Sequence, residues 1–570
     1  MNSKPQIIII GLDAAVLTLV EPWVAEGKLP HLAALIKNGI SGTLESVIPP
    51  LTPAAWTSFM TGKNPGKHGI YNFMEHQPDG YGLLFTSGAN RRAETLWKIA
   101  NQAGLTVGVM NTPFTYPPEK LNGFQISGLD TPSPASAFIH PPELRKEIEE
   151  NLGPLKLDLR YLGFMTNFEK RAQVLDELKA SDAQWRRLAL YLLDKHPQDI
   201  MMFTFMSIDT IQHYFWHYMD KNHFYHDAEG AVLFQNAILE CYQRLDATVG
   251  EIVQRLDDQA TVLVVSDHGQ AAVSDRTLCI NRILAQSGLL VCKPAPFWKT
   301  LLERIVSPAY NFLRSKLTSA QKVAIARIFP KMRDSVDSMV TSYSNIDWSK
   351  TKAFCHEAWA TPPSVSINLK GVKPQGIVEP ADYEKVMKDV VAALQTVKDP
   401  RTNQPVIQKI YRRDEIYSGP FTDRAPDLTL EWWGESPFNT KPSLGSEAGE
   451  PPLKIEKPHP LRMSEWCGNH VLHGILVGRG PRLRSGVSCS GARLIDLAPT
   501  ILALLGLPIP SDMDGRVLAE ILDSQSQNWN YTNPKETSNF LPHEQEGDGY
   551  SQEEAELVEE RLKNLGYLES

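Results

Sequence analysis

The hydrophobic residues of this 570-residue chain form short continuous runs, separated by longer amphipathic segments. The runs are Ile7–Leu12, Met201–Met206, Thr261–Val265 and Gly474–Gly478. Continuous apolar runs of this length are typical of strands buried on both faces of a sheet. Between them, Pro30–Asn38 and Phe234–Leu256 repeat apolar residues at helical spacing. The pattern predicts an α/β fold with a mostly parallel central sheet covered by helices on both faces.

Polar side chains that could bind a metal follow three of these predicted strands. Asp13 comes directly after the first run, Asp209 lies shortly beyond the second, and Asp267 and His268 lie at the end of the third. In open α/β sheets, ligands bind just outside the carboxyl ends of the strands. We therefore expect these side chains to lie close together at one edge of the sheet.

Composition and charge exclude several classes of protein. Apolar residues make up 42% and charged residues 22% of the chain, as in soluble proteins with a sizeable core. The 57 Lys and Arg residues against 66 Asp and Glu residues leave a net charge of −9. No polycationic block is available to neutralise a nucleic acid polymer. No apolar run approaches the ~18 residues that a membrane span needs.

The cysteines and the N-terminus indicate a reducing compartment. The six cysteines are scattered, without a C-x-x-C pair, which argues against a thiolate zinc site and a disulfide framework. The apolar residues Ile7–Ile10 are too few for the core of a signal peptide, and no cleavage site follows them. We therefore expect a cytoplasmic protein.

The spacing of the acids and histidines indicates a metal centre. Asp209 and His213 lie at i and i+4, one helical turn apart on one face. Asp267 and His268 are adjacent and present their side chains from one tight turn. Carboxylate and imidazole ligands without cysteine suit Zn²⁺ or Mn²⁺. Two such ions about 3.5–4 Å apart would stabilise both oxygens of a phosphoryl displacement. The full set of candidates is Asp13, Asp209, His213, Asp267, His268 and His470.

Thr52 is the candidate nucleophile. Pro53 suits the first position of a helix, which places Thr52 at or near the N-cap, where the helix favours an anion. A hydroxyl whose pKa is lowered by a metal is a competent nucleophile, whereas without a metal the same residue is an ordinary cap. The rival hydroxyls, Thr57 and Ser58, lie one to two turns further on, where the helix would direct them away from the metals.

Several motifs occur along the chain in a fixed order. They are Gly11–Asp13, Leu51–Ser58, Thr61–Ile70, Ser266–Gly269, Ile367–Gly371, Ala425–Leu428, Gly468–His470 and Asp496–Thr500. Together they resemble the type I phosphodiesterase / nucleotide pyrophosphatase branch of the alkaline phosphatase superfamily, over about residues 7–520. The resemblance implies an alkaline-phosphatase-like, three-layer αβα sandwich with a helical cap insertion.

The resemblance also implies a role for each candidate residue. It assigns Asp13, Thr52, Asp267 and His268 to one metal ion, and Asp209, His213 and His470 to the other. Thr52 would be both ligand and nucleophile, and the two divalent ions would be Zn²⁺, with Mn²⁺ as the alternative. His473 competes for the place of His470, which stands at the family's Gly-x-His position.

The sequence departs from the family at one place that concerns the substrate. Nucleotide pyrophosphatases carry an asparagine shortly after His-Gly-Ile that donates to the phosphoryl oxygen. Here Asn72 stands one position early and Phe73 takes the matching place, so Asn72 is a candidate substrate-binding residue, together with His473. The Cys/Ser-x-Pro-x-Arg motif of the superfamily's sulfatases does not surround Thr52, which argues against a sulfatase.

These observations predict a metal-dependent phosphohydrolase. It would cleave a phosphodiester or nucleotide pyrophosphate bond of a small phosphorylated substrate through a phosphothreonine at Thr52, and two in-line displacements would retain configuration at phosphorus. A phosphomutase or phosphomonoesterase on the same metal core is the alternative, because water access to the intermediate decides between them. A binding module with a dead site is disfavoured by the intact ligand set.

The chain divides into a discontinuous catalytic domain and two further parts. We predict a catalytic domain over residues 1–292 and 351–523, a helical cap over 293–350, and a polar tail with a terminal helix over 524–570. The stretch 297–333 is basic with interleaved apolar residues. It is either an interfacial helix that brings the site to lipid headgroups by peripheral membrane contact, or a cap with a solvated basic face.

Overall fold

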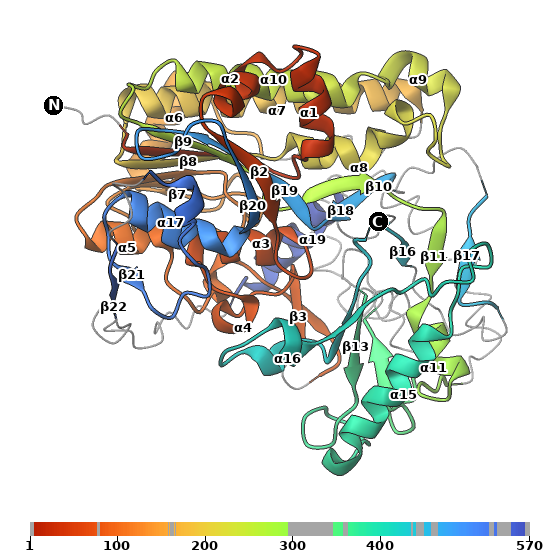
Figure 1. Cartoon of the computed structure of the whole chain (residues 1–570). Coiled ribbons are helices and arrows are strands. Elements are labelled where there is room, and N and C mark those ends of the chain that lie inside the picture. The colour runs from red at the N-terminus through yellow and green to blue at the C-terminus, as the bar shows by residue number, and fades with distance from the viewer. Residues whose placement is uncertain are drawn as a thin grey trace.

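In the computed structural model the chain builds a nine-stranded central sheet (Figure 1). In spatial order the strands are β20 (Val487–Arg493), β2 (Ile40–Glu45), β19 (His473–Arg479), β9 (Thr261–Val265), β1 (Ile7–Leu12), β8 (Ile200–Phe205), β5 (Val107–Met110), β6 (Gly123–Ile126) and β7 (Ile139–His140). Strands β19 and β7 run antiparallel to their neighbours, and every other pair is parallel. The structure describes residues 5–76, 80–157, 159, 165, 167–293, 346–356, 363–434, 437–440, 450–457, 466–523, 529–532 and 549–564.

Helices cover both faces of this sheet. Ile8 and Ile10 of β1 pack with one set of helices, and Ile7 and Ile9 pack with the other, because side chains alternate between the faces of a strand. The first layer contains α1 (Leu17–Ala25), α2 (Pro30–Lys37), α6 (Pro142–Leu152), α7 (Phe168–Lys195), α8 (Ser207–Met219) and α10 (Ala237–Val253), and the second contains α3 (Thr52–Thr61), α5 (Leu96–Gln102) and α17 (Leu497–Leu504). The predicted α/β fold of three layers is confirmed (Figure 1).

The predicted elements differ from the observed ones mainly at their ends. Strands β1 and β9 have the predicted bounds, and β8 begins and ends one residue early, at Ile200 and Phe205. The long predicted helix from Phe234 begins at Ala237 instead, because the chain before it forms a separate helix, α9 (Ala228–Phe234). These shifts leave the polar residues past the strand ends in place.

A second, smaller sheet lies beside the main one, and the sequence analysis did not predict it. It consists of the antiparallel strands β12 (Ala353–Cys355), β13 (Ser364–Ile367), β15 (Leu428–Leu430) and β14 (Ile410–Arg412), and we call it the small sheet. Helices α11 (Ile280–Gln286) and α15 (Tyr383–Gln395) pack on it around a core of its own, as Figure 1 shows. Asp427, from one of the sequence motifs, accepts the backbone N–H of Ile367 at 2.7 Å and so ties two of its strands together.

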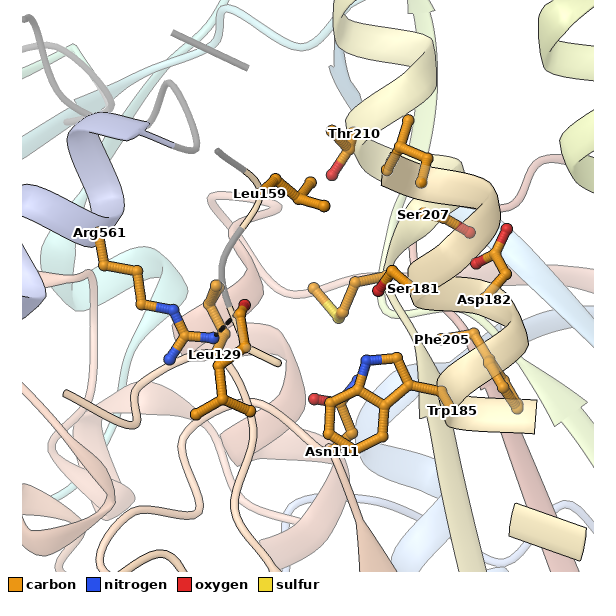
Figure 2. Close-up of a pocket in the computed structure, with 13 residues that line it drawn as sticks. Asn111, Leu129, Leu159, Ser181, Asp182, Trp185, Phe205, Ser207, Thr210 and Arg561 are labelled. Atoms are coloured by element: carbon orange, nitrogen blue, oxygen red, sulfur yellow. Dashed lines mark hydrogen bonds between the residues drawn. The ribbon is translucent and has the colours of Figure 1, made fainter. Parts of the chain in front are cut away.

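The C-terminal helix α19 (Gln552–Asn564) packs on the main core through Val558 and Leu562. A cavity of about 60 Å³ lies between it, α7 and α8. Figure 2 shows Asp182 and Trp185 of α7, Ser207 and Thr210 of α8, and Arg561 of α19 around this cavity. Its charged groups are engaged within the protein, since Asp182 accepts from Arg244 and Arg561 donates to the carbonyl oxygens of Thr131 and Leu157.

Two sequence predictions lie outside the described residues. The structure does not describe residues 294–345, so the helical cap over 293–350 and the nature of the basic stretch 297–333 stay predictions. The division of the chain into domains also stays a prediction. Among the helices that the structure does describe, none has the length and apolar character needed to span a membrane.

Candidate metal centre

The candidate ligands meet at the carboxyl edge of the central sheet. Asp13 follows β1, Asp209 lies in the first turn of α8 just after β8, and Asp267 follows β9. These three strands are parallel neighbours, so their ends meet at one edge. Strand β19 runs the opposite way and begins at that edge, which is why His470, shortly before it on β18 (Gly468–Val471), reaches the same place.

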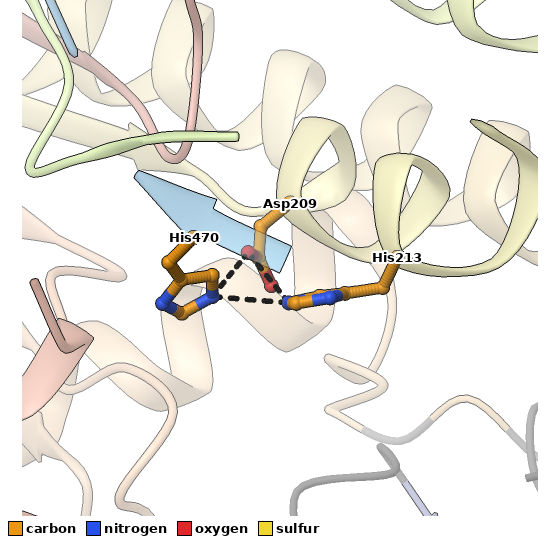
Figure 3. A group of neighbouring side chains, drawn as sticks. All are labelled: Asp209, His213 and His470. Atoms are coloured by element: carbon orange, nitrogen blue, oxygen red, sulfur yellow. Dashed lines mark hydrogen bonds and ion pairs between the residues drawn. The ribbon is translucent and has the colours of Figure 1, made fainter. Parts of the chain in front are cut away.

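The first cluster contains Asp209, His213 and His470, and all three side chains are buried. Figure 3 shows both imidazole rings turned toward the carboxylate of Asp209. Each Nε2 atom lies 3.2 Å from Asp209 Oδ1, and the two Nε2 atoms are 3.0 Å apart. Asp209 and His213 come from successive turns of α8, as their i, i+4 spacing predicts.

The second cluster contains Asp13, Asp267, His268 and Thr52. Nε2 of His268 lies 3.3 Å from Asp267 Oδ2, 3.8 Å from Asp13 Oδ1 and 3.3 Å from Thr52 Oγ1. The structure therefore brings together the residues that the sequence analysis assigned to one ion. It also differs in one respect, because Asp13, Asp209 and His268 offer ligand atoms within 4.8 Å of one another. Asp209 is shared by the two clusters and does not belong to one alone.

The hydrogen bonds of the three histidines fix which nitrogen carries the proton. Nδ1 of His213, His268 and His470 lies 2.8 to 3.1 Å from the carbonyl oxygens of Gly468, Gly269 and Pro50 respectively. Because a carbonyl oxygen only accepts, each Nδ1 carries a proton and donates it, which leaves the Nε2 lone pair directed into the cluster. Burial lowers the pKa of His268 and of His470. Backbone carbonyl groups orient metal-bound histidines in this way.

Two carboxylate oxygens of the centre, one on Asp13 and one on Asp267, have no hydrogen-bond donor among the described residues. Asp13 and Asp267 are fully buried, and burial, followed by the charge of neighbouring carboxylates, raises the pKa of both well above the usual value. Asp13 Oδ1 and Asp267 Oδ2 accept no hydrogen bond from the part of the chain that the structure describes. Carboxylate oxygens and imidazole lone pairs that converge in a buried site require positive charge. The residues present therefore fit divalent cations that accept N and O ligands.

Thr52 reaches this centre from the start of α3. The helix begins at Thr52 itself, with Leu51 in the N-cap position and Pro53 as the second helical residue, so the predicted boundary was one residue late. Among the described residues, the Thr52 hydroxyl bonds to His268 and not to the backbone of its own helix. It donates to His268 Nε2, whose other nitrogen is protonated. The side chain that could cap the helix is thereby directed at the metal ligands.

The rival hydroxyls of α3 contact other groups. Ser58 Oγ lies 2.8 Å from Nε2 of the buried His68, whose Nδ1 accepts the backbone N–H of Ile70 at 3.2 Å. Thr57 is also buried, and its hydroxyl has no hydrogen-bond partner within the described ranges. Neither hydroxyl contacts a candidate ligand in the described structure, so of the three only Thr52 bonds to the cluster.

The two predicted substrate-binding residues do not bond to the cluster. The amide oxygen of Asn72 accepts the N–H of Phe73 at 2.8 Å, which fixes it locally. His473 is the first residue of β19, and its side chain is exposed. Neither makes a hydrogen bond to a candidate ligand in the described structure. The position of the two side chains therefore favours His470 over His473 as the candidate ligand.

Three residues that sequence reasoning missed support the centre. Trp56 donates from Nε1 to Asp13 Oδ2 at 2.8 Å, and its place one turn after Thr52 is the signal that could have revealed it. The ring of Trp466 stacks on His213 with centroids 3.7 Å apart. Pro50 supplies the carbonyl oxygen for His470 Nδ1. No local sequence pattern predicts the last two contacts, because each joins segments that are far apart in the sequence.

Comparison with known proteins identifies the family of this chain. The model of one protein family, described as type I phosphodiesterase / nucleotide pyrophosphatase, matches residues 7–443. The chain belongs to that family. The resemblance inferred from the motifs is thereby confirmed, and the protein is a hydrolase that acts on phosphoric ester bonds.

Solved structures of ectonucleotide pyrophosphatase / phosphodiesterase 5 are among those that match. The human protein is 12% identical, with a TM-score of 0.47, and the match covers 91% of this chain and 100% of that chain. An inactive variant of the murine protein, in complex with AMP, gives the same four values. No curated protein sequence matches the chain.

Proposed function

We propose that the protein hydrolyses a phosphodiester or nucleotide pyrophosphate bond in two steps, through a phosphothreonine at Thr52. The observation that carries this proposal is the position of Thr52 Oγ1, 3.3 Å from His268 Nε2 and at the head of a helix that it does not cap. Asp13, Thr52, Asp267 and His268 would hold one divalent cation and Asp209, His213 and His470 the other, with Asp209 close enough to serve both.

Zn²⁺ is the proposed cation, because buried imidazole and carboxylate ligands in small number suit it, with Mn²⁺ as the alternative. When bound, such ions neutralise the buried carboxylates, lower the pKa of a coordinated hydroxyl group and stabilise charge on phosphoryl oxygens. The protein's own contribution is to hold the ligands in place: carbonyl groups orient the three histidines, and Trp56 orients Asp13.

Thr52 would carry the covalent chemistry. In the first step the proton of Oγ1 passes to solvent, Oγ1 forms a bond to phosphorus, the bond from phosphorus to the leaving oxygen breaks, and that oxygen takes a proton from solvent. In the second step water loses a proton and forms the new bond to phosphorus, the bond to Oγ1 breaks, Oγ1 is protonated again, and the phosphomonoester product leaves. The start of α3 favours the negative phosphoryl group in both steps. Since each step inverts configuration, the product retains it.

A panel assay tests this proposal. The purified protein, stripped with a chelator and reloaded with Zn²⁺ or Mn²⁺, is offered nitrophenyl phosphodiesters, nitrophenyl monoesters, nucleotides and glycerophosphodiesters. We expect about two bound ions per chain and faster cleavage of diesters or pyrophosphates than of monoesters. A protein that binds no ion and stays inactive with both metals would contradict the dinuclear assignment. Preference for monoesters would overturn the proposed substrate class and leave the metal centre intact.

A further inference from the structure

Ala14, the residue after Asp13, has an unusual backbone conformation. Its φ is 60°, in the left-handed region that costs a non-glycine residue free energy and persists only where surrounding contacts impose it. Its N–H donates to Asp267 Oδ1 at 3.4 Å, and its carbonyl oxygen accepts from Gln212 Nε2 at 3.0 Å. Asp267 belongs to the second cluster, and Gln212 directly precedes His213 of the first. The peptide groups of Ala14 therefore join the two clusters.

Gln212 uses its whole side-chain amide in this contact. The second N–H of Nε2 donates to Gln270 Oε1 at 3.1 Å, and Oε1 accepts the hydroxyl of Tyr242 at 3.3 Å. The oxygen of Tyr242 in turn accepts the N–H of Val16 at 3.2 Å. Both donors of the amide face oxygen acceptors, so the orientation of the amide group is settled by its partners. Gln212 is fully buried, and because each polar atom of its amide has a partner, the group is held rigidly.

The same glutamine lies against the segment that carries His470. Its partner Gln270, on β10 (Gly269–Ala272), stands opposite His470 in the antiparallel pairing with β18. Gly468 passes so close to Gln212 that a Cβ atom at Gly468 would lie 2.4 Å from the Gln212 carbonyl oxygen. Gln212 thus lies on the helix of His213 and contacts both the turn after β1 and the strand beside His470.

We propose that Gln212 is a positioning residue that couples the two ligand clusters. It holds Ala14 in its strained conformation, and through Ala14 it keeps Asp13 and Asp267 in a fixed position relative to Asp209 and His213. The inference rests on the proposed function, because it concerns clusters that hold cations. It predicts that loss of the amide weakens binding at both clusters, whereas a role confined to the position of His213 would affect only the cluster that contains His213.

The test compares Gln212→Met with Gln125→Met. Gln125 is a fully buried glutamine on β6 that donates to the carbonyl oxygen of Thr115 at 2.8 Å, remote in sequence from every candidate ligand. Zn²⁺ dissociation constants are measured for both ions by competition with a chelator. Supporting residues of metal ligands change affinity about 10–100-fold when removed, and we expect a loss in that range for both ions in Gln212→Met. Gln125→Met should leave both constants unchanged.

The outcomes separate this inference from the proposed function. If the wild-type protein binds two ions and Gln212→Met weakens the binding of only one of them or of neither, the coupling role is overturned and the proposed function stands. If the wild-type protein binds none, both are overturned. Should Gln212→Met fail to fold, Tyr242→Phe takes its place, since it removes the hydroxyl that donates to Gln212 and keeps the ring. We expect Tyr242→Phe to weaken the binding of both ions several-fold, and unchanged dissociation constants would overturn the inference.

Discussion

The proposed role of Thr52 as the nucleophile depends on contacts that its hydroxyl does not make. A threonine at the start of a helix ordinarily accepts a backbone N–H of the first turn. In α3 the helix begins at Thr52 and Leu51 occupies the cap position, so the hydroxyl is not used in this way. It points instead to His268, within a cluster whose other members are carboxylates. This orientation distinguishes a nucleophile from a helix cap.

Replacing Thr52 tests that assignment. Thr52→Ala removes the attacking oxygen and leaves the carboxylates and imidazoles in place, so the protein should fold and bind at least one ion. We expect kcat to fall by at least about 1,000-fold, because the covalent route is lost. Thr52→Ser keeps the hydroxyl and should retain much of the rate. Thr57→Ala and Ser58→Ala are the matched controls on the same helix, and if either abolishes activity while Thr52→Ala does not, the nucleophile is misassigned.

His68 makes the stability of the protein depend on pH. Burial, followed by the charges of Arg91 and Lys63, lowers the pKa of His68 to about 3. The folded state therefore keeps it neutral, whereas the unfolded chain protonates it near its ordinary pKa of about 6.5. Its contribution to stability is present above pH 6.5 and is lost as the pH falls toward 3, by up to about 1.4 kcal/mol per pH unit.

Denaturant unfolding at pH 7 and pH 5 measures this loss. His68→Gln cannot be protonated, so it should be less stable than wild type at pH 7 and should lose about 2 kcal/mol less between pH 7 and pH 5. If the free energies of unfolding of the two proteins change equally with pH, His68 has the same pKa in the folded and unfolded states, which would contradict this prediction. The contacts of His68 argue otherwise, since a proton on Nδ1 would meet the N–H of Ile70.

At the scale of elements, the positions of the strands could be predicted from the sequence, whereas their directions in the sheet could not. The runs at β1 and β9 are continuous, apolar and followed by acids, so both the strand and the site at its end are encoded locally. The direction of β19 is not encoded in that way, because a buried apolar run has the same pattern in either direction. The sharing of Asp209 between two clusters could not be predicted either, since it depends on side-chain positions from three elements.

The packing of α3 on β1 also limits which residues β1 can hold. A Cβ atom at Gly11 would lie 2.9 Å from Trp56 Cη2 and 3.0 Å from Thr204 Oγ1, closer than carbon atoms approach in a packed core. We expect Gly11→Ala to lower the free energy of unfolding by about 1–3 kcal/mol. It should also weaken metal binding, because Trp56 must move and it donates to Asp13.

Urea unfolding and metal competition check this prediction, with Gly434→Ala as the control. A Cβ atom at Gly434 would meet no atom within 4 Å, so that variant should change stability by less than about 0.5 kcal/mol. Equal effects of the two substitutions would mean that the loss reflects the glycine backbone and not the contact with Trp56.

At the scale of the whole molecule, the small sheet is the part that the sequence did not reveal. Its strands have only three or four residues each and join segments from Ala353 to Leu430. Such runs are too short for hydrophobic periodicity to identify, and their pairing is decided by a core that forms only after folding. Two of the family motifs, at Ile367 and Asp427, lie in this sheet, so part of the family resemblance describes the support of the site and not the site itself.

A hydrogen bond links the region of the small sheet to the segment that carries Thr52. The hydroxyl of Tyr417, which lies just after β14 and helix α16 (Arg413–Ile416), donates to the carbonyl oxygen of Ile48 at 2.8 Å. Its ring packs edge-on against Tyr71, with centroids 5.0 Å apart. Pro50, which holds His470, and Thr52 follow within four residues of Ile48. Tyr417, just beyond the edge of the small sheet, thereby holds the segment that leads to the candidate metal centre.

Tyr417→Phe should loosen that segment without disturbing the small sheet itself. It removes the hydrogen bond to Ile48 and leaves the ring packing, so we expect a loss of about 1 kcal/mol in stability. Hydrogen exchange should become faster at the backbone amides of Leu51 and Thr52, because local opening now costs less free energy. Tyr383→Phe is the matched control, since the Tyr383 hydroxyl donates to Asp427 at 2.6 Å inside the small sheet. It should speed exchange around Ile367 and leave Leu51 and Thr52 unchanged. If both variants speed exchange equally at Thr52, the small sheet stabilises the molecule as a whole and does not act through Tyr417.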